Sequence, residues 1–250
     1  MRFRSFCWLP LLVLLAWGCS KDYSYEGGNA NRRCVDCEYL PVCDSSLFRY
    51  VDSNGTRIDT LDNQMFVLGD STINGRRYSK VSGFATFNTG LFANCDNGDY
   101  RLLFPLTALG INLDSMLNAL LQVPGSPFPI PPGLIRAPQT ITTSVLKVGV
   151  PVGGTWLDTI YNLSLPPLVT LFAGLRYTVV AKGTQRTVFS NTYNDVIHVR
   201  STTQVISTLI SLPVNFSIDY FFAKGVGLIE VQVRQPTGPE RVLKLYSYTL

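Results

Sequence analysis

Alternating apolar and polar positions dominate the chain from about residue 47 onward and predict β-strands. Val169–Val179 shows this clearly, because its apolar residues alternate with polar ones such as Arg176 and Thr178. Val214–Phe222 repeats the pattern. A period of two places one face of each strand toward a core. The residues expected to line a concave, ligand-facing side are Val169, Leu171, Leu175, Tyr177, Phe216, Tyr220 and Phe222.

Two Asn-Gly pairs predict β-hairpins, at Asn54-Gly55 and at Asn74-Gly75. Both central positions of the favoured two-residue turn need a positive φ, which Asn and Gly adopt readily. The strands expected around these turns are, in chain order, Leu47–Asp52, Thr56–Leu61, Met65–Thr72 and Arg76–Asn88, and a last strand is expected at Val242–Leu250.

One segment breaks the period of two. Asn112–Val123 carries apolar residues at helical spacing behind a possible N-cap at Asn112, and six prolines between Pro124 and Pro138 follow it. The pattern therefore predicts one short helix and a proline-rich loop. They could form a lid over a curved sheet, or the helix could simply cover one end of the core, and the sequence supports both equally.

Residues 1–18 predict an export signal, because two arginines precede a short apolar run from Phe6 to Trp17 that ends at Gly18. About twenty apolar residues are needed to span a bilayer, so the run is too short for a transmembrane anchor. Cys19 is the predicted lipid-attachment residue. Ala16 and Trp17 depart from the usual Leu and Ala or Ser before such a cysteine, so ordinary cleavage after Gly18 stays an alternative.

The cysteine count favours lipidation of Cys19. Removal of Cys7 with the signal leaves five cysteines, an odd number. Acylation of Cys19 leaves an even set that can close two disulfides by any of three pairings. A four-thiolate zinc site is the alternative, but export to an oxidising compartment favours disulfides. We therefore predict no metal and no cofactor, and the disulfide candidates are Cys34, Cys37, Cys43 and Cys95.

Composition fits a folded domain behind a tether. Residues 19–46 are predicted to form a lipidated, flexible tether with the cysteine cluster, and residues 47–250 a single β-rich domain. The charge of +4 falls to +2 without the first nineteen residues, which hold two arginines and no acid. So small a net positive charge does not favour nucleic acid as a partner.

Three motifs carry a resemblance to a known group of proteins. Three segments, Val152–Thr159, Tyr220–Glu230 and Leu243–Tyr248, resemble motifs of uncharacterised Gram-negative lipoproteins. These motifs are, in the same order, Gly-x-x-Trp, a Tyr/Trp-x-Ala-x-Gly-Val-Gly strand and a closing Leu-x-Ser-Tyr strand. The resemblance implies a mainly β fold similar to the lipoprotein carriers LolA and LolB, an antiparallel sheet curled into an incomplete barrel. It also implies an outer-membrane lipoprotein, on the periplasmic face or the cell surface. It implies little about activity.

The glycines of the second motif have two physical explanations. Gly225 and Gly227 could bend the sheet at a bulge, or Lys224-Gly225 could be a plain hairpin turn. The sequence leaves both open.

One pair of short motifs resembles the catalytic residues of an enzyme family. Gly69-Asp70-Ser71 with Asp195-x-x-His198 resembles the blocks of SGNH-type esterases, in which Ser71 would be the nucleophile, His198 the base and Asp195 its partner. Those enzymes are α/β proteins, whereas Ser71 runs into a predicted hairpin. We therefore predict that the protein is not an enzyme. We expect the His198 side chain to lie beside Arg200 on the polar face of a strand.

Two functional hypotheses remain. The first is a binding or carrier lipoprotein that is anchored to the membrane through acyl chains on Cys19 and holds a lipid or another apolar or amphiphilic ligand. The second is a structural or interaction protein of the cell envelope, whose barrel is filled by Leu113–Leu121 and whose outer surface binds a protein partner.

Overall fold

The computed structural model describes residues 34–35, 37–54, 57–83, 91–105, 140–165, 169–207, 217–234 and 240–250. The predicted signal, Cys19, the predicted helix Asn112–Val123 and the proline-rich segment lie outside these ranges. Strands and turns make up the regular structure of the described residues. No helix among them is long and apolar enough to cross a membrane.

Twelve of the described strands form one sheet, in which every pairing is antiparallel. A separate two-stranded ribbon joins β1 (Cys34–Val35) to β2 (Val42–Cys43). The strands of the large sheet are β3 (Ser46–Asn54), β4 (Arg57–Ile73), β5 (Arg76–Ser82), β6 (Leu91–Asp96), β7 (Asp99–Pro105), β8 (Thr140–Lys147), β9 (Thr155–Leu165), β10 (Val169–Val188), β11 (Asn191–Ser207), β12 (Ser217–Ala223), β13 (Gly227–Arg234) and β14 (Arg241–Thr249).

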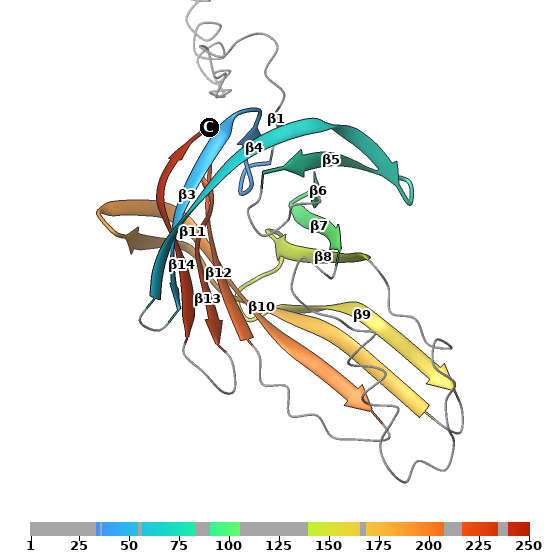
Figure 1. Ribbon diagram of the computed structural model, residues 1–250. Coiled ribbons are helices and arrows are strands. Elements are labelled where there is room, and N and C mark those ends of the chain that lie inside the picture. Colours follow the sequence, from blue (N-terminus) through green and yellow to red (C-terminus); the bar gives the residue numbers. More distant parts are fainter. Residues whose placement is uncertain are drawn as a thin grey trace, which may run out of the picture. The chain divides into compact units, whose positions relative to one another are not determined.

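The sheet curls into a nearly closed barrel with one unsealed seam. Its order runs from β8 back along the chain to β3, crosses to β14, and then runs back from β14 to β9. β8 and β9 follow one another in sequence, yet they are the two ends of the sheet and meet at the seam (Figure 1). The predicted mainly β fold, an antiparallel sheet curled into an incomplete barrel, is therefore confirmed.

The Asn74-Gly75 hairpin is confirmed. Asn74 has φ 50° and Gly75 has φ 75°, as the turn between β4 and β5 requires. The pairing of Asn54 with Arg57 likewise brings β3 and β4 together around the first predicted turn. Gly55 and Thr56 themselves lie outside the described residues.

The separate strands predicted at Thr56–Leu61 and Met65–Thr72 are wrong, because β4 is continuous from Arg57 to Ile73. Its first half pairs with β3 as far as Met65, and its second half pairs with β5 from Phe66 onward. Since the two halves use different partners, no turn is needed between them. The alternation of side chains also continues through the junction, where Met65 and Val67 are buried and Phe66 is exposed.

Residues 34–46, which the sequence assigned to the tether, belong instead to the folded domain. Val35, Tyr39 and Val42 are buried in the same core as the barrel side chains. The disulfide prediction is confirmed, and the structure selects one of the three pairings, Cys34–Cys43 and Cys37–Cys95. The second disulfide joins this segment to β6. The local sequence does not show this packing, because the partners of the segment lie far away along the chain.

The Gly-Val-Gly motif forms a tight turn with a bulge beside it. Lys224–Val226 make the turn between β12 and β13, with φ 71° at Gly225 and φ 104° at Gly227. The pairing of Phe221 with Glu230 and of Phe222 with Leu228 leaves one extra residue on β13. The hairpin turn at Lys224-Gly225 is therefore confirmed, whereas the bulge lies at Ile229 and not at either glycine.

Candidate functional site

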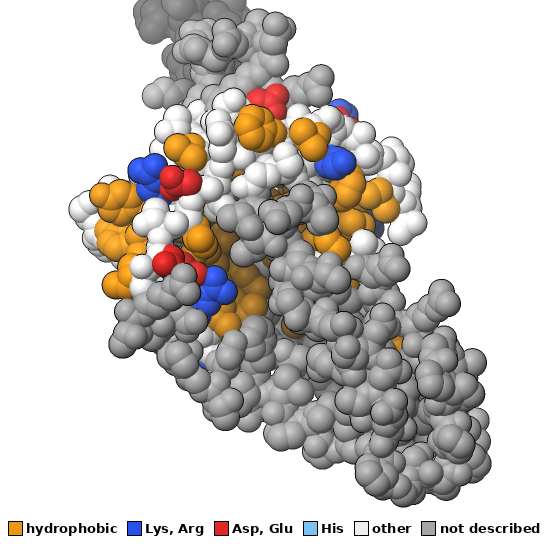
Figure 2. All heavy atoms as spheres, in the orientation of Figure 1, with side chains coloured by type: hydrophobic (Ala, Val, Ile, Leu, Met, Phe, Trp, Pro, Cys, Tyr) orange, Lys and Arg blue, Asp and Glu red, His pale blue; other side chains and the backbone are white. Residues whose placement is uncertain are grey.

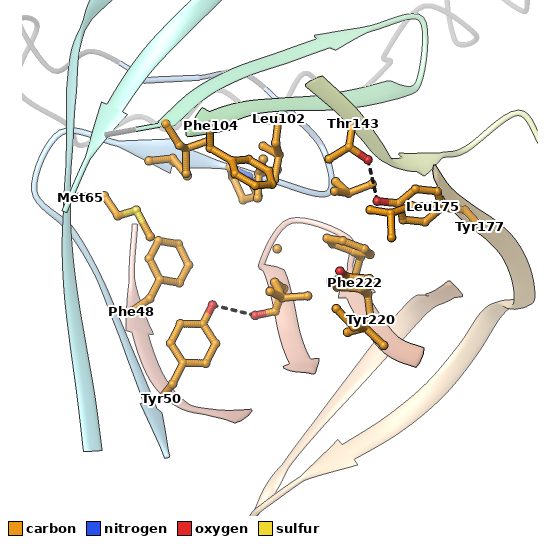
Figure 3. Close-up of a pocket in the computed structure, with 18 of the residues that line it drawn as sticks. Phe48, Tyr50, Met65, Leu102, Phe104, Thr143, Leu175, Tyr177, Tyr220 and Phe222 are labelled. Atoms are coloured by element: carbon orange, nitrogen blue, oxygen red, sulfur yellow. Dashed lines mark hydrogen bonds between the residues drawn. The ribbon is translucent and has the colours of Figure 1, made fainter. Parts of the chain in front are cut away.

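The inside of the barrel holds a cavity of about 290 Å³ with an almost wholly apolar wall. Figure 3 shows side chains from opposite parts of the sheet pointing into it, among them Phe48, Phe104 and Phe222. The wall is built by Leu40, Pro41, Val42, Phe48, Tyr50, Met65, Leu91, Leu102, Phe104, Thr143, Val145, Ile160, Leu175, Tyr177, Thr203, Ile218, Tyr220, Phe222, Val226, Gly227 and Leu228. The described lining residues include none with a formal charge, so the cavity is suited to an apolar occupant.

Four of the residues predicted from the sequence line this cavity. They are Leu175 and Tyr177 on β10 and Tyr220 and Phe222 on β12. The remaining three lie outside what is described, since the Val169 and Leu171 side chains and the whole of Phe216 fall there. The structure thus brings two strands with the same alternation to one wall.

Sequence reasoning missed the opposite half of the wall, which comes from β3, β4, β6, β7 and β8. Phe48 and Tyr50 alternate with Arg49, so the same period of two marks them. Leu102 and Phe104 belong to a strand with no polar residue between Leu102 and Pro105. Without alternation, the sequence does not show which of these side chains point into the barrel. Only the curvature of the sheet brings these side chains across from β10 and β12.

The hydroxyl groups in the wall form hydrogen bonds within the protein. Tyr50 Oη donates to the carbonyl oxygen of Leu228 at 2.9 Å, and Tyr177 Oη lies 2.6 Å from Thr143 Oγ1 (Figure 3). Burial raises the pKa of Tyr50. Burial also raises the pKa of Tyr220 to about 12, although the hydrogen bond between Tyr220 and Ser201 acts to lower it. These phenols therefore stay neutral, and the cavity offers a ligand mainly apolar contact.

The seam beside the cavity is bridged by side chains. Asp158 of β9 accepts hydrogen bonds from the backbone N–H of Ser144 at 2.6 Å and from Thr143 Oγ1 at 2.9 Å. Trp156 Nε1 of the same strand donates to the carbonyl oxygen of Ser144 at 2.7 Å, and its ring stacks on Tyr177 at 5.2 Å. The Gly-x-x-Trp motif of the sequence thus supplies the groups that hold β9 against β8.

Asp158 is a titratable group that is hydrogen-bonded to Thr143 of the cavity wall. Burial raises the pKa of its carboxyl, while the hydrogen bonds from Ser144 and Thr143 act in the opposite direction. Because Thr143 also bonds Tyr177, a continuous set of hydrogen bonds runs from the seam to the wall. Opening of the seam would therefore disturb the cavity.

His198 has a partner that the sequence did not predict. Its Nε2 lies 2.6 Å from Asp219 Oδ1, and Arg200 and Arg234 also bind that carboxylate. Asp219 is only 1% exposed and lies on β12, the neighbour of β11. Burial lowers the pKa of His198, and the hydrogen bond with Asp219 offsets part of that effect. His198 does lie on the face that carries Arg200, as expected.

The esterase-like residues are distributed over distant strands. Ser71 lies on β4 beside Tyr78 of β5, and four strands separate β4 from the strand of His198 in the sheet order. Asp195 is exposed and lies 3.9 Å from Lys224 Nζ, while Asp219 occupies the position beside the imidazole. The Asp-x-x-His spacing therefore does not produce an Asp195–His198 pair.

Within the described ranges, no group of three or more His, Cys, Asp or Glu side chains is placed to hold a metal ion. The four described cysteines are joined in disulfides, so their thiolates are not free for coordination. On the face drawn in Figure 2, charged side chains lie mostly as small pairs of opposite sign among apolar and uncharged atoms.

No protein-family model matches the sequence, and no curated protein matches it. Among solved structures, the chain is similar to a "putative lipoprotein" from Parabacteroides distasonis ATCC 8503, with a TM-score of 0.41, 11% identity, and coverage of 86% of this chain and 100% of that chain. It is also similar to a "putative exported protein with YmcC-like fold" from Bacteroides fragilis NCTC 9343, with a TM-score of 0.39, 7% identity, and coverage of 83% and 96%. The function has to be inferred from the chain's own residues.

Proposed function

We propose that the chain is an exported, membrane-tethered lipoprotein whose barrel binds an apolar or amphiphilic molecule. The observation that carries the proposal is the cavity of about 290 Å³, whose described wall is uncharged and whose principal hydroxyls bond within the protein. An apolar cavity of about half that volume holds a benzene molecule. The barrel therefore has room for an apolar group roughly twice as large.

The proposed tether is Cys19, behind the export signal at residues 1–18. Each buried methylene of an acyl chain contributes about 0.8 kcal/mol, so two or three chains would hold the domain at a membrane surface. The proposed location is the outer membrane, on the periplasmic face or at the cell surface. Lipid from that membrane would be within reach of the cavity.

A cavity-filling substitution tests the proposal. Leu102→Trp places a larger side chain in the cavity wall. Leu157→Trp makes the same change on the outer surface, where Leu157 is 45% exposed. The probe is N-phenyl-1-naphthylamine, whose fluorescence rises in apolar surroundings. We expect binding by the full chain, a loss of roughly tenfold or more in Leu102→Trp, and no change in Leu157→Trp.

Two results would contradict a binding function. One is an absence of probe binding together with native mass spectra that show no co-purified lipid. The other is equal probe binding by the two tryptophan variants, which would place the probe elsewhere on the surface. Urea unfolding of Leu102→Trp checks that the barrel still folds, because overpacking a core costs about 1–3 kcal/mol.

A structural or interaction role is the second candidate, supported by exposed apolar side chains on the outside of β4. Ile58, Phe66 and Leu68 are exposed there, and such side chains favour contact with another protein. Crosslinking in intact cells from a photoreactive residue at position 68 tests this role. A single abundant adduct supports it, and its absence contradicts it.

A further inference from the structure

A second, more open hollow lies between the ends of three elements. The start of β11, the turn between β12 and β13 and the end of β14 enclose a groove of about 580 Å³. It exists because the long β10–β11 hairpin reaches β14, where the Phe189 ring meets the Tyr246 ring edge to face at 5.7 Å. Of the described residues, the groove and the barrel cavity share only Val226.

The lining of the groove differs in chemistry from that of the cavity. Two exposed tyrosines of β14, Tyr246 at 53% and Tyr248 at 39%, present aromatic rings to solvent. Beside them lie the amide of Asn191 and the hydroxyls of Thr192 and Ser247. An exposed aromatic ring next to amides and hydroxyls offers a flat apolar face together with both donors and acceptors.

Tyr193 adds a nearly buried side chain to the groove lining, with 7% of its surface exposed. Its hydroxyl is turned away from solvent and lies beside the Asn191 side chain.

The one charged side chain in the described lining of the groove, Lys224, is already paired with two carboxylates. Lys224 Nζ lies 2.6 Å from a Glu38 carboxylate oxygen and 3.9 Å from Asp195. No other charged residue is among the described lining. The groove therefore favours a neutral ligand over an ionic one.

We infer that this groove binds a neutral oligosaccharide. A pyranose ring has an apolar C–H face that packs on an aromatic ring, and a rim of hydroxyls that pairs with amides and hydroxyls. Tyr246 and Tyr248 supply the first kind of contact, and Asn191, Thr192 and Ser247 the second. The site is separate from the barrel cavity, so it can bind whether or not the cavity holds a ligand.

Tyr246 is the residue to alter first. Its ring packs on Phe189 and is half exposed, whereas Tyr248 stacks on Phe48, which belongs to the barrel core. Tyr246→Ala therefore removes a stacking face with little effect on the core. Phe66→Ala is the matched control, because Phe66 is a 40% exposed aromatic side chain on β4 and does not line the groove.

The test is saturation-transfer NMR and calorimetry on the full chain in a detergent without sugar. The probes are maltotetraose, chitotetraose and mannotetraose, each up to about 10 mM, which detects dissociation constants in the millimolar range. We expect at least one probe to bind. Tyr246→Ala should weaken it roughly three- to tenfold. Asn191→Ala should also weaken it, and Phe66→Ala should leave it unchanged.

Three outcomes would overturn the inference. The first is no binding of any of the three probes. The second is an equal loss in Tyr246→Ala and Phe66→Ala. The third is binding of an extended peptide at the groove when none of the saccharides binds. Leu102→Trp separates this inference from the proposed function, because filling the cavity should leave saccharide binding intact.

Discussion

Asp158 accepts a hydrogen bond from the backbone N–H of Ser144 at 2.6 Å and so joins β9 to β8. The pairing found for the described strands includes no ladder between these two, so single side chains hold the seam. The same carboxylate oxygen accepts the Thr143 hydroxyl, which also bonds Tyr177 in the cavity wall. Asp158 therefore couples the closure of the barrel to the cavity wall, and Trp156, which donates to the carbonyl oxygen of Ser144, acts beside it.

Asp158→Ala should destabilise the domain by about 1–3 kcal/mol, because it leaves the Ser144 N–H without its acceptor. Both hydrogen bonds reach a single oxygen of Asp158. The amide oxygen of Asp158→Asn can accept both, so this variant should keep most of the stability. Urea unfolding of the two variants provides the measurement. Equal loss in both would show that the charge, and not the acceptor, holds the seam.

The same pair of variants should reveal a pH effect. Burial raises the pKa of Asp158 above its ordinary 3.8, so the folded state holds this proton where the unfolded chain has released it. The contribution of Asp158 to stability is therefore full below about pH 3.8 and is lost as the pH rises through the folded pKa. Subtracting the stability–pH curve of Asp158→Asn from that of the native protein should show this fall. A difference that rises with pH would contradict it.

His198 and Asp219 should make the domain sensitive to acid. Burial lowers the pKa of His198 below 6.5, so stability is lost as the pH falls below that value. Burial opposes ionisation of Asp219, yet the hydrogen bonds from Arg200 and His198 outweigh it and lower its pKa below 3.8, which adds a second loss at lower pH. His198→Gln should remove the first loss and retain the second. Unfolding midpoints measured across this range would show a single stage in the variant, and two stages there would contradict the assignment.

The two disulfides should differ in their contribution to stability. Cys37 and Cys95 are 58 residues apart, whereas Cys34 and Cys43 are 9 apart. Cross-linking the longer loop restricts the unfolded chain more, by about 4 kcal/mol against about 3 kcal/mol. The paired variant Cys37→Ser/Cys95→Ser should therefore unfold at lower urea than Cys34→Ser/Cys43→Ser. The reverse order would show that strain or buried contacts, and not loop length, decide the effect.

The hydroxyl of Tyr177 offers a prediction about the cavity wall. Tyr177→Phe keeps the ring stacked on Trp156 and removes the hydrogen bond to Thr143, which still has Asp158 as an acceptor. The loss should be about 1 kcal/mol, with the probe still bound in the cavity. Tyr50→Phe is the matched variant on the other side of the wall, where the carbonyl oxygen of Leu228 loses its donor. Loss of probe binding in Tyr177→Phe alone would mean that the seam opens.

The local pattern predicted the strands and one wall of the site. The period of two marked Leu175, Tyr177, Tyr220 and Phe222, and each lines the cavity. The pattern predicted two strands with a break before Met65, whereas β4 continues through this position. Where a strand ends depends on its neighbours, and they are distant in sequence.

The sequence by itself determined that the domain is β-rich, that Asn74-Gly75 forms a hairpin turn, and that the four candidate cysteines form disulfides. These features depend on side-chain period, allowed backbone angles and the number of cysteines, which can all be read without knowing which strands are neighbours. Only the tertiary structure decided that Cys37 pairs with Cys95, that Asp219 faces His198, and that β8 and β9 meet without a ladder. Such contacts are set by the register and curvature of the whole sheet, which no short stretch of sequence contains.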